Sequence, residues 1–345
     1  MMRLLIVGML ISLGVAGCCA TGATHESRSY HVSERFVLGG SGGWDLLAVD
    51  SARQRVFLSR ADHIVVMDAA SGKVIGEIPD TAGVHGIALA PALKRGFASN
   101  GRARSVTVFD LDSLAVQGTI GVTGDNPDVI LYDSFSNHVI TFNGRSANAT
   151  VIDAATLRVI DTIALAGKPE FAASDSHGRV FVNIEDKSEL SVLDSRTDTI
   201  VSTWPLAPCE EPSGLALDST HQRLFSVCDN HKMVVVDATT GRVIADLPIG
   251  EGPDGAGYDP DDHMAFSSNG DGTLTVVREV DAEHFEVVAN IATQKSARTM
   301  VVDPTTHLLY LPAAELGPRP SPTAEQPHPR APIVPGTFTV LVVSP

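Results

Sequence analysis

The sequence is poor in cysteine and in basic residues, and each shortage excludes a class of function. Only four of the 345 residues are cysteine. Their positions, 18, 19, 209 and 228, allow neither a C-x-x-C-H haem attachment motif nor a cysteine-rich zinc site. There are 25 Lys and Arg against 41 Asp and Glu, which gives a formal net charge of −16. Such a field repels phosphate backbones, so no nucleic-acid partner is expected.

Long apolar runs are also missing, except for one at the N-terminus. Arg3 precedes an apolar run at residues 4–15, which is too short for the roughly 30 Å core of a bilayer and typical of a signal peptide. The string VAGC at 15–18 resembles the bacterial lipobox, which ends in an acylated cysteine. We therefore expect a lipoprotein-type signal peptide at 1–17, lipidation of Cys18 and a tether at 18–29. The expected location is the periplasm, at the outer membrane and held only by lipid. The alternative is an ordinary signal peptide on a soluble periplasmic or secreted protein.

The rest of the chain is dominated by a repeat. A short apolar strand ends in a landmark residue seven times, at spacings of 41 to 44 residues; the landmarks are Asp50, Pro91, Asp133, Asp175, Asp218, Asp259 and Asp303. Each unit holds four short strands joined by turns rich in Gly, Asn, Asp, Ser and Thr. This period is typical of β-propeller blades. The sequence predicts an all-β, seven-bladed propeller of four-stranded antiparallel blades spanning residues 30–345.

The last unit of the repeat lacks one strand, and one extra strand precedes the first unit. The last unit stops at FTVLVVSP without a fourth strand, while an extra strand, SYHVSERFVLG, precedes the first unit. We expect the N-terminal strand to join the C-terminal blade, because this closes the ring and removes exposed sheet edges.

Several strings recur from unit to unit and resemble a known family. The second strand ends in Asn as FASN (97–100), ITFN (140–143), VFVN (180–183) and FSSN (266–269), and phrases such as VVVDATTGRVI follow. Together they resemble the YVTN-repeat, YncE-like exported β-propellers over residues 30–345. Blade one departs with FLSR (57–60) and blade five with FSVCDN (225–230). The resemblance implies a fold and export, and it supplies no particular activity.

A set of polar residues should surround one mouth of the propeller channel. Counting back five residues from each landmark gives Asp45, Gly86, Asp128, Glu170, Ser213, Asp254 and Arg298, with Trp44, His85 and Glu211 beside them. Apart from Gly86 and Ser213, these are the candidate ligand-binding residues. Clustered carboxylates would attract a cation or a positively charged ligand. Alternatively, they bind channel waters and backbone groups, and Arg298 merely neutralises Asp254 or Asp45.

Three further features carry expectations. Rim histidines such as His221 and His263 occur one per blade on the opposite face, so they should not converge on a metal, and no metal site is assigned. Cys209 and Cys228 fall on one face of blade five, which favours a disulfide; a free, reactive pair is the alternative. A Pro-rich insert at 313–337 interrupts the last blade, either packed over the channel mouth or as a floppy excursion.

Two functions remain. The first is a ligand- or protein-binding scaffold that uses the acidic channel face, with an unknown small molecule or envelope protein as partner and no cofactor. The second is a lactonase-type hydrolase, in which Asp45, Asp128, Glu170 and Asp254 hold a divalent cation and His85 acts as base. The chain carries no H-E-x-x-H motif and no phosphate-binding loop, which favours binding over catalysis.

Overall fold

A computed structural model describes residues 29–323 and 329–345 of the chain. The expected signal peptide, the expected acylation site Cys18 and most of the expected tether lie outside the described residues. Within them, 28 strands form seven four-stranded antiparallel sheets, and the helical content is three short 3-10 turns. No helix in this part of the chain is long and apolar enough to cross a membrane.

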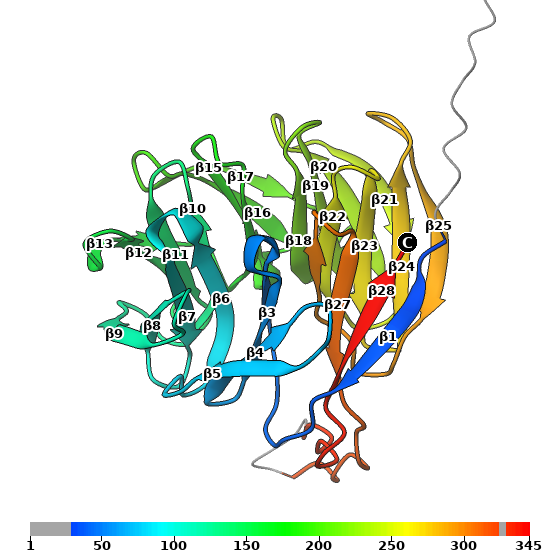
Figure 1. Ribbon diagram of the computed structural model, residues 1–345. Helices are drawn as coiled ribbons and strands as arrows, with labels where there is room; N and C mark the ends of the chain where they lie inside the picture. The colour runs from blue at the N-terminus through cyan, green and yellow to red at the C-terminus, as the bar shows by residue number, and fades with distance from the viewer. Residues whose placement is uncertain (1–28, 324–328) are drawn as a thin grey trace, which may run out of the picture.

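The sheets are the seven expected blades, arranged around a common axis (Figure 1). Blade one comprises β2 (Leu47–Asp50), β3 (Arg55–Arg60), β4 (His63–Asp68) and β5 (Val74–Ile78). Blade two comprises β6 (Val84–Ala90), β7 (Arg95–Asn100), β8 (Ser105–Asp110) and β9 (Val116–Gly121). Blade three comprises β10 (Pro127–Asp133), β11 (His138–Asn143), β12 (Asn148–Asp153) and β13 (Arg158–Ala164). Blade four comprises β14 (Pro169–Ser174), β15 (Arg179–Ile184), β16 (Glu189–Asp194) and β17 (Thr199–Pro205). Blade five comprises β18 (Pro212–Asp218), β19 (Arg223–Cys228), β20 (Lys232–Asp237) and β21 (Val243–Pro248). Blade six comprises β22 (Pro253–Asp259), β23 (Met264–Asn269), β24 (Thr273–Glu279) and β25 (Phe285–Ala292). The 3-10 turns are η1 (Ser51–Arg53), η2 (Pro91–Leu93) and η3 (Glu185–Lys187).

The seventh blade is built from both ends of the chain, as predicted. Its strands are β26 (Val301–Asp303), β27 (Leu308–Ala313) and β28 (Thr339–Ser344), and β1 (His31–Val37) is its outer strand. Strand β1 pairs antiparallel with β28 from His31 opposite Ser344 to Val37 opposite Thr339. Figure 1 shows the two strands, blue and red, side by side. The pairing covers the edge of β28 and completes the ring.

The core lies between neighbouring blades. The third residue of the second strand is a fully buried phenylalanine in five blades, namely Phe57, Phe97, Phe181, Phe225 and Phe266. Each side chain packs in a cluster that joins two adjacent sheets. Burying one such ring contributes about 1.5–3 kcal/mol, so the repeated Phe holds each sheet against the next.

Candidate functional site

One cavity lies at the end of the channel where the first strand of each blade begins. Residues from all seven blades line it, and its volume is about 290 Å³. We call it the channel mouth; its lining is Trp44, Asp45, Leu46, His85, Asp128, Val129, Lys168, Glu170, Phe171, Glu185, Ser213, Asp254, Arg298 and Arg330. Seven of the eight ligand-binding candidates therefore meet in one cavity. The exception, Glu211, is exposed and is not part of this lining.

Hydrogen bonds between blades fix the backbone of the lining residues. The carbonyl of Asp45 accepts from Thr299 Oγ1 of blade seven at 2.8 Å. The carbonyl of His85 accepts from the backbone N–H of Leu46 in blade one at 3.2 Å. The carbonyl of Asp128 accepts from the hydroxyl of Ser99 in blade two. Asp45, His85 and Asp128 are thus each held at the start of their own blade by a hydrogen bond from the preceding blade.

Three ionisable groups meet on one side of the channel mouth. Nδ1 of His85 lies 2.6 Å from Oδ2 of Asp45 and 3.6 Å from Oδ1 of Asp128. Burial alone would lower the pKa of His85, but the hydrogen bond to Asp45 and the charges of Asp128, Asp45 and Glu170 outweigh it, so its pKa is raised. Burial also raises the pKa of Asp128, which the charge of His85 only partly offsets.

The remaining carboxylates of the channel mouth outnumber the cations that pair with them. Nζ of Lys168 lies 2.6 Å from Oε1 of Glu170 and also contacts Oε2 of Glu185. One ammonium cannot fully neutralise two carboxylates, and burial together with the charge of Asp128 raises the pKa of Glu170 to about 8. Asp254 lies 3.3 Å from Nη1 of Arg298, yet burial still raises its pKa to about 6.

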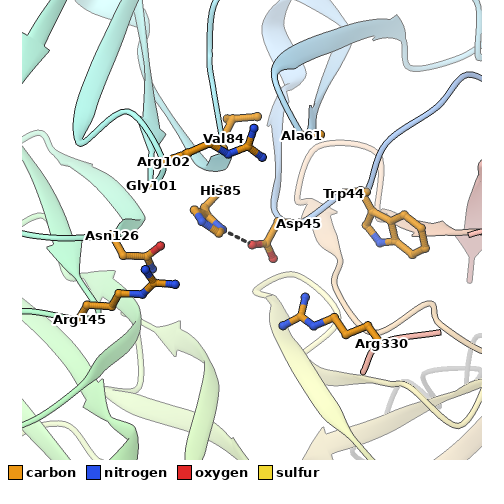
Figure 2. Close-up of a pocket in the computed structure, with 12 residues that line it drawn as sticks. Trp44, Asp45, Ala61, Val84, His85, Gly101, Arg102, Asn126, Arg145 and Arg330 are labelled. Atoms are coloured by element: carbon orange, nitrogen blue, oxygen red, sulfur yellow. Dashed lines mark hydrogen bonds and ion pairs between the residues drawn. The ribbon is translucent and has the colours of Figure 1, made fainter. Parts of the chain in front are cut away.

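A second cavity of about 380 Å³ adjoins the channel mouth, with which it shares Trp44, Asp45, His85 and Arg330. Its polar lining includes Arg102, Arg145 and Asn126. Figure 2 shows the side chains of Arg102, Arg145 and Arg330 around the His85–Asp45 pair. No salt bridge joins any of these three arginines to another residue in the described part of the chain. We call Arg102, Arg145 and Arg330 the arginine rim.

The Pro-rich insert reaches this site. It connects β27 to β28, and its two arms touch through a bridge between Leu316 and Ile333 and a hydrogen bond from Gly317 N–H to Pro332 O of 2.8 Å. Arg330 lines both cavities. Arg330 of the insert therefore borders the channel mouth.

Five charged residues of the site were not among the candidates, namely Lys168, Glu185, Arg102, Arg145 and Arg330. Lys168 and Glu185 flank the strands of blade four, outside the counted position, while Arg330 belongs to an insert without a counterpart in other blades. Arg102 follows the recurring Asn of blade two, in a turn that we did not assign to the site. Counting also placed Gly86 at the mouth in blade two, where the lining residue is His85. The landmark Pro91 lies one residue beyond the end of β6, whereas Asp133 is the last residue of β10, so the count in blade two is displaced by one residue.

The recurring Asn residues serve the blades themselves. Nδ2 of Asn100 donates to the hydroxyls of Ser105 and Thr107, and Nδ2 of Asn269 makes the equivalent bonds to Thr273 and Thr275. These groups are almost fully buried, so their hydrogen bonds stabilise the turn between the second and third strands.

Blade five contains a disulfide where the other blades end their second strand in a polar side chain, Ile or Ala. Cys209 precedes β18, Cys228 ends β19, and the two are bonded. Both residues are buried. The bridge ties the loop entering blade five to the body of that blade.

The expectation that rim histidines stay apart is wrong for one pair. The rings of His221 and His263, from blades five and six, lie 5.3 Å apart between centroids, and Glu279 lies beside them. The turns of adjacent blades lean toward each other at this end of the channel, which spacing along the sequence does not reveal.

Comparison with known proteins supports the architecture. No protein-family profile and no curated protein matches the chain. Among solved structures, the chain is similar to U3-55K, with 10% identity and a TM-score of 0.73 over 91% of this chain and 99% of that one. It is similar to the RRP9 WD40 repeats with 10% identity and a TM-score of 0.74 over 92% of this chain and 99% of that one. It is also similar to hydrazine synthase of Kuenenia stuttgartiensis, with 16% identity and a TM-score of 0.66 over 78% of this chain and 92% of that one. At these identities the likeness concerns the fold alone. The chain is a seven-bladed β-propeller with WD40-like structural neighbours.

Proposed function

We propose that the chain is a binding module whose channel mouth holds a positively charged group of a small ligand. The observation that carries this proposal is a charge imbalance inside the cavity. Five carboxylates line it against three fixed cations, Lys168, Arg298 and Arg330. The side chains of Asp128, Glu170 and Asp254 are only 21%, 16% and 18% exposed, so water compensates them poorly. Burial and the charge of Asp128 raise the pKa of Glu170 to about 8, so Glu170 is mostly protonated while the site is empty, and a cationic group of a ligand would favour its charged form.

The arginine rim indicates the other end of the ligand. Three guanidinium groups surround one side of the cavity, and none of them forms a salt bridge with a carboxylate of the described residues. Guanidinium groups bind carboxylates and phosphates through paired hydrogen bonds. The ligand class that fits both features carries an amine, which enters the channel mouth, and an anionic group, which the rim holds. Trp44 would contribute an aromatic face to the same cavity.

Hydrolysis with a metal in the channel mouth has weaker support. Ligand atoms of Asp45, His85 and Asp128 lie within 4.8 Å of one another. However, two of the four carboxylates that would hold the cation, Asp254 and Glu170, are already paired with Arg298 and Lys168. One G-x-S-x-G string occurs, at residues 39–43, but it lies outside the strands and helices, and the carbonyls of Gly39, Ser41 and Gly42 accept from Arg60. We therefore place binding ahead of catalysis.

We also propose that this module belongs to the YncE-like exported propellers and is anchored at the outer membrane through Cys18. The recurring strings and the lipobox-like VAGC support this assignment. Replacing Cys18 with Ser should move the protein from the membrane fraction to the soluble envelope fraction. An unchanged distribution would refute anchoring through Cys18.

Ligand binding is tested by calorimetric titration with three probes: lysine, cadaverine and succinate. Lysine carries both charges, cadaverine only cations and succinate only anions. We expect lysine to bind best and more weakly at high salt. The variant Asp128→Asn/Glu170→Gln should lose most of the binding of lysine and cadaverine. Glu211→Gln, which removes an exposed carboxylate outside the cavity, should behave like the wild type. Equal binding by the wild type and the double variant, or no binding of any probe, would contradict the proposal.

A further inference from the structure

A second group of ionisable side chains lies at the opposite end of the first strands, between blades five and six. His221 follows β18, His263 precedes β23 and Glu279 ends β24. One possible ligand atom from each lies within 4.8 Å of the other two. Asp218 is in contact as well, because its Oδ2 is 2.6 Å from Nδ1 of His221. Two imidazoles and two carboxylates therefore come together from two blades.

Glu279 is an exception within the repeat. Its backbone N–H donates to the carbonyl of His263, and the residues that make the equivalent bond in other blades are Ala69, Leu111, Ala154, Ser195 and Ala238. All of these are buried and uncharged. Blade six instead places a carboxylate here, although Glu279 is only 8% exposed. Burying a charge where the architecture accepts alanine is costly unless the carboxylate has a specific partner.

The carboxylate of Glu279 has few hydrogen-bond donors among the described residues. The hydroxyl of Tyr258 lies 2.8 Å from Oε2 of Glu279 and 3.1 Å from Oδ2 of Asp218. A phenol has one proton and can donate it to only one of the two. By contrast, Asp133, at the matching position of blade three, receives hydrogen bonds from the hydroxyls of Ser136, Ser174 and Ser195. Asp218 accepts from the backbone N–H of Thr220 and lies beside Nδ1 of His221, so Glu279 is the member of this pair that lacks such a set of donors.

We propose that His221, His263 and Glu279 bind one Zn²⁺ ion, with Asp218 in reach as a fourth ligand. Two imidazoles and a carboxylate are a ligand set that zinc commonly takes. Nδ1 of His221 is 3.6 Å from Oε1 of Glu279, at the upper end of the roughly 3.3–3.6 Å that separates two ligands of a tetrahedral zinc with bonds of about 2.0–2.2 Å. The side chain of His221 is 44% exposed and can rotate to complete the geometry.

Zinc at this position would join blades five and six. His221 and Asp218 belong to one sheet, whereas His263, Tyr258 and Glu279 belong to the next. The ion would therefore replace an electrostatically unfavourable contact between two blades by a coordinate cross-link. This site lies at the end of the channel opposite the channel mouth, so the inference is independent of the proposed ligand.

The test measures zinc bound to the metal-free full chain by equilibrium dialysis. Free thiols are first alkylated, which removes Cys18 and Cys19 as ligands and leaves the Cys209–Cys228 disulfide intact. The wild type should bind one equivalent of zinc more than Glu279→Ala and more than His221→Ala/His263→Ala. Glu279→Ala restores the residue type of the other blades and should fold normally, as circular dichroism would verify.

His138→Gln is the matched control, because His138 lies on the same face and pairs with Asp198 of another blade. It should retain the same zinc equivalent as the wild type. Zinc should also raise the melting temperature of the wild type and of His138→Gln, and leave that of Glu279→Ala unchanged. Equal zinc stoichiometry in the wild type and both site variants, or the absence of bound zinc in the wild type, would overturn the proposal.

Discussion

Nδ1 of His85 in blade two lies 2.6 Å from Oδ2 of Asp45, which precedes blade one. The two residues are 40 positions apart, about one repeat, and the packing of blade one against blade two brings them into one cavity. The other charged side chains of the channel mouth come from blades three, four, six and seven.

Protonation of the channel mouth should make stability depend on pH. Burial raises the pKa of Asp254 from 3.8 to about 6 and that of Glu170 from 4.5 to about 8. The folded protein thus binds these protons more tightly than the unfolded chain. Their contribution is fully present below the ordinary pKa values and is lost as the pH rises through about 6 and about 8. Urea unfolding should show a wild-type free energy of unfolding that falls over this range.

Glu170→Gln isolates the part due to Glu170. Its free energy of unfolding should fall less than that of the wild type between about pH 5 and 8, because glutamine stays neutral throughout. Glu211→Gln, which removes an exposed carboxylate, should follow the wild-type curve. Parallel curves for Glu170→Gln and the wild type would show that Glu170 is not protonated more readily in the folded state.

Arg60 should be a major stabilising residue of the ring closure. It ends β3, where four other blades end the second strand in Asn or place Asn next to last, and only 2% of it is exposed. Its guanidinium donates to the carbonyls of Ser41 at 2.9 Å and Gly39 at 3.3 Å, and lies 3.6 Å from the centroid of the Phe338 ring. Both Arg60→Met and Arg60→Asn should lower the free energy of unfolding by about 3 kcal/mol.

The Arg60→Asn variant makes this prediction specific. It restores the Asn of the repeat but is too short to reach the carbonyls of residues 39–42. Arg158→Asn, at an exposed position of β13, should change the free energy of unfolding by less than about 0.5 kcal/mol. If thermal or urea unfolding found Arg60→Asn as stable as the wild type, the N-terminal loop would not depend on this arginine.

The disulfide should stabilise blade five through the loop it closes. Cys209 and Cys228 are 19 residues apart, and a loop of this size restricts the unfolded chain by about 3 kcal/mol. Cys209→Ala/Cys228→Ala should lose that amount in urea unfolding. A reducing agent should lower the stability of the wild type and leave the double variant unchanged. If reduction left the wild type equally stable, the entropic account would not hold for this loop.

The sequence predicts the blades because every blade repeats the same local pattern. Landmarks such as Asp218 and Asp259 mark the end of a first strand, and the unmatched strands at the two ends predict that β1 joins β28. Since the repeat also fixes where each first strand begins, counting back from the landmarks correctly places Asp128 and Asp254 in one cavity.

Features that break the repeat could not be predicted in this way. Arg330 comes from the insert, whose path over the channel mouth is set by packing rather than by periodicity. His221 and His263 lie in turns whose separation depends on how adjacent sheets twist toward each other. Arg60 and Cys228 were visible as departures from Asn, but the carbonyls that surround Arg60 appear only once the chain is folded.

The central claim is that a cationic group occupies the channel mouth, and a crystal structure with bound lysine tests it most directly. We predict the ligand ammonium within hydrogen-bond distance of the carboxylates of Asp128 or Glu170, with its carboxylate against the arginine rim. Lysine bound elsewhere, or a channel mouth that holds only water at saturating lysine, would contradict the account.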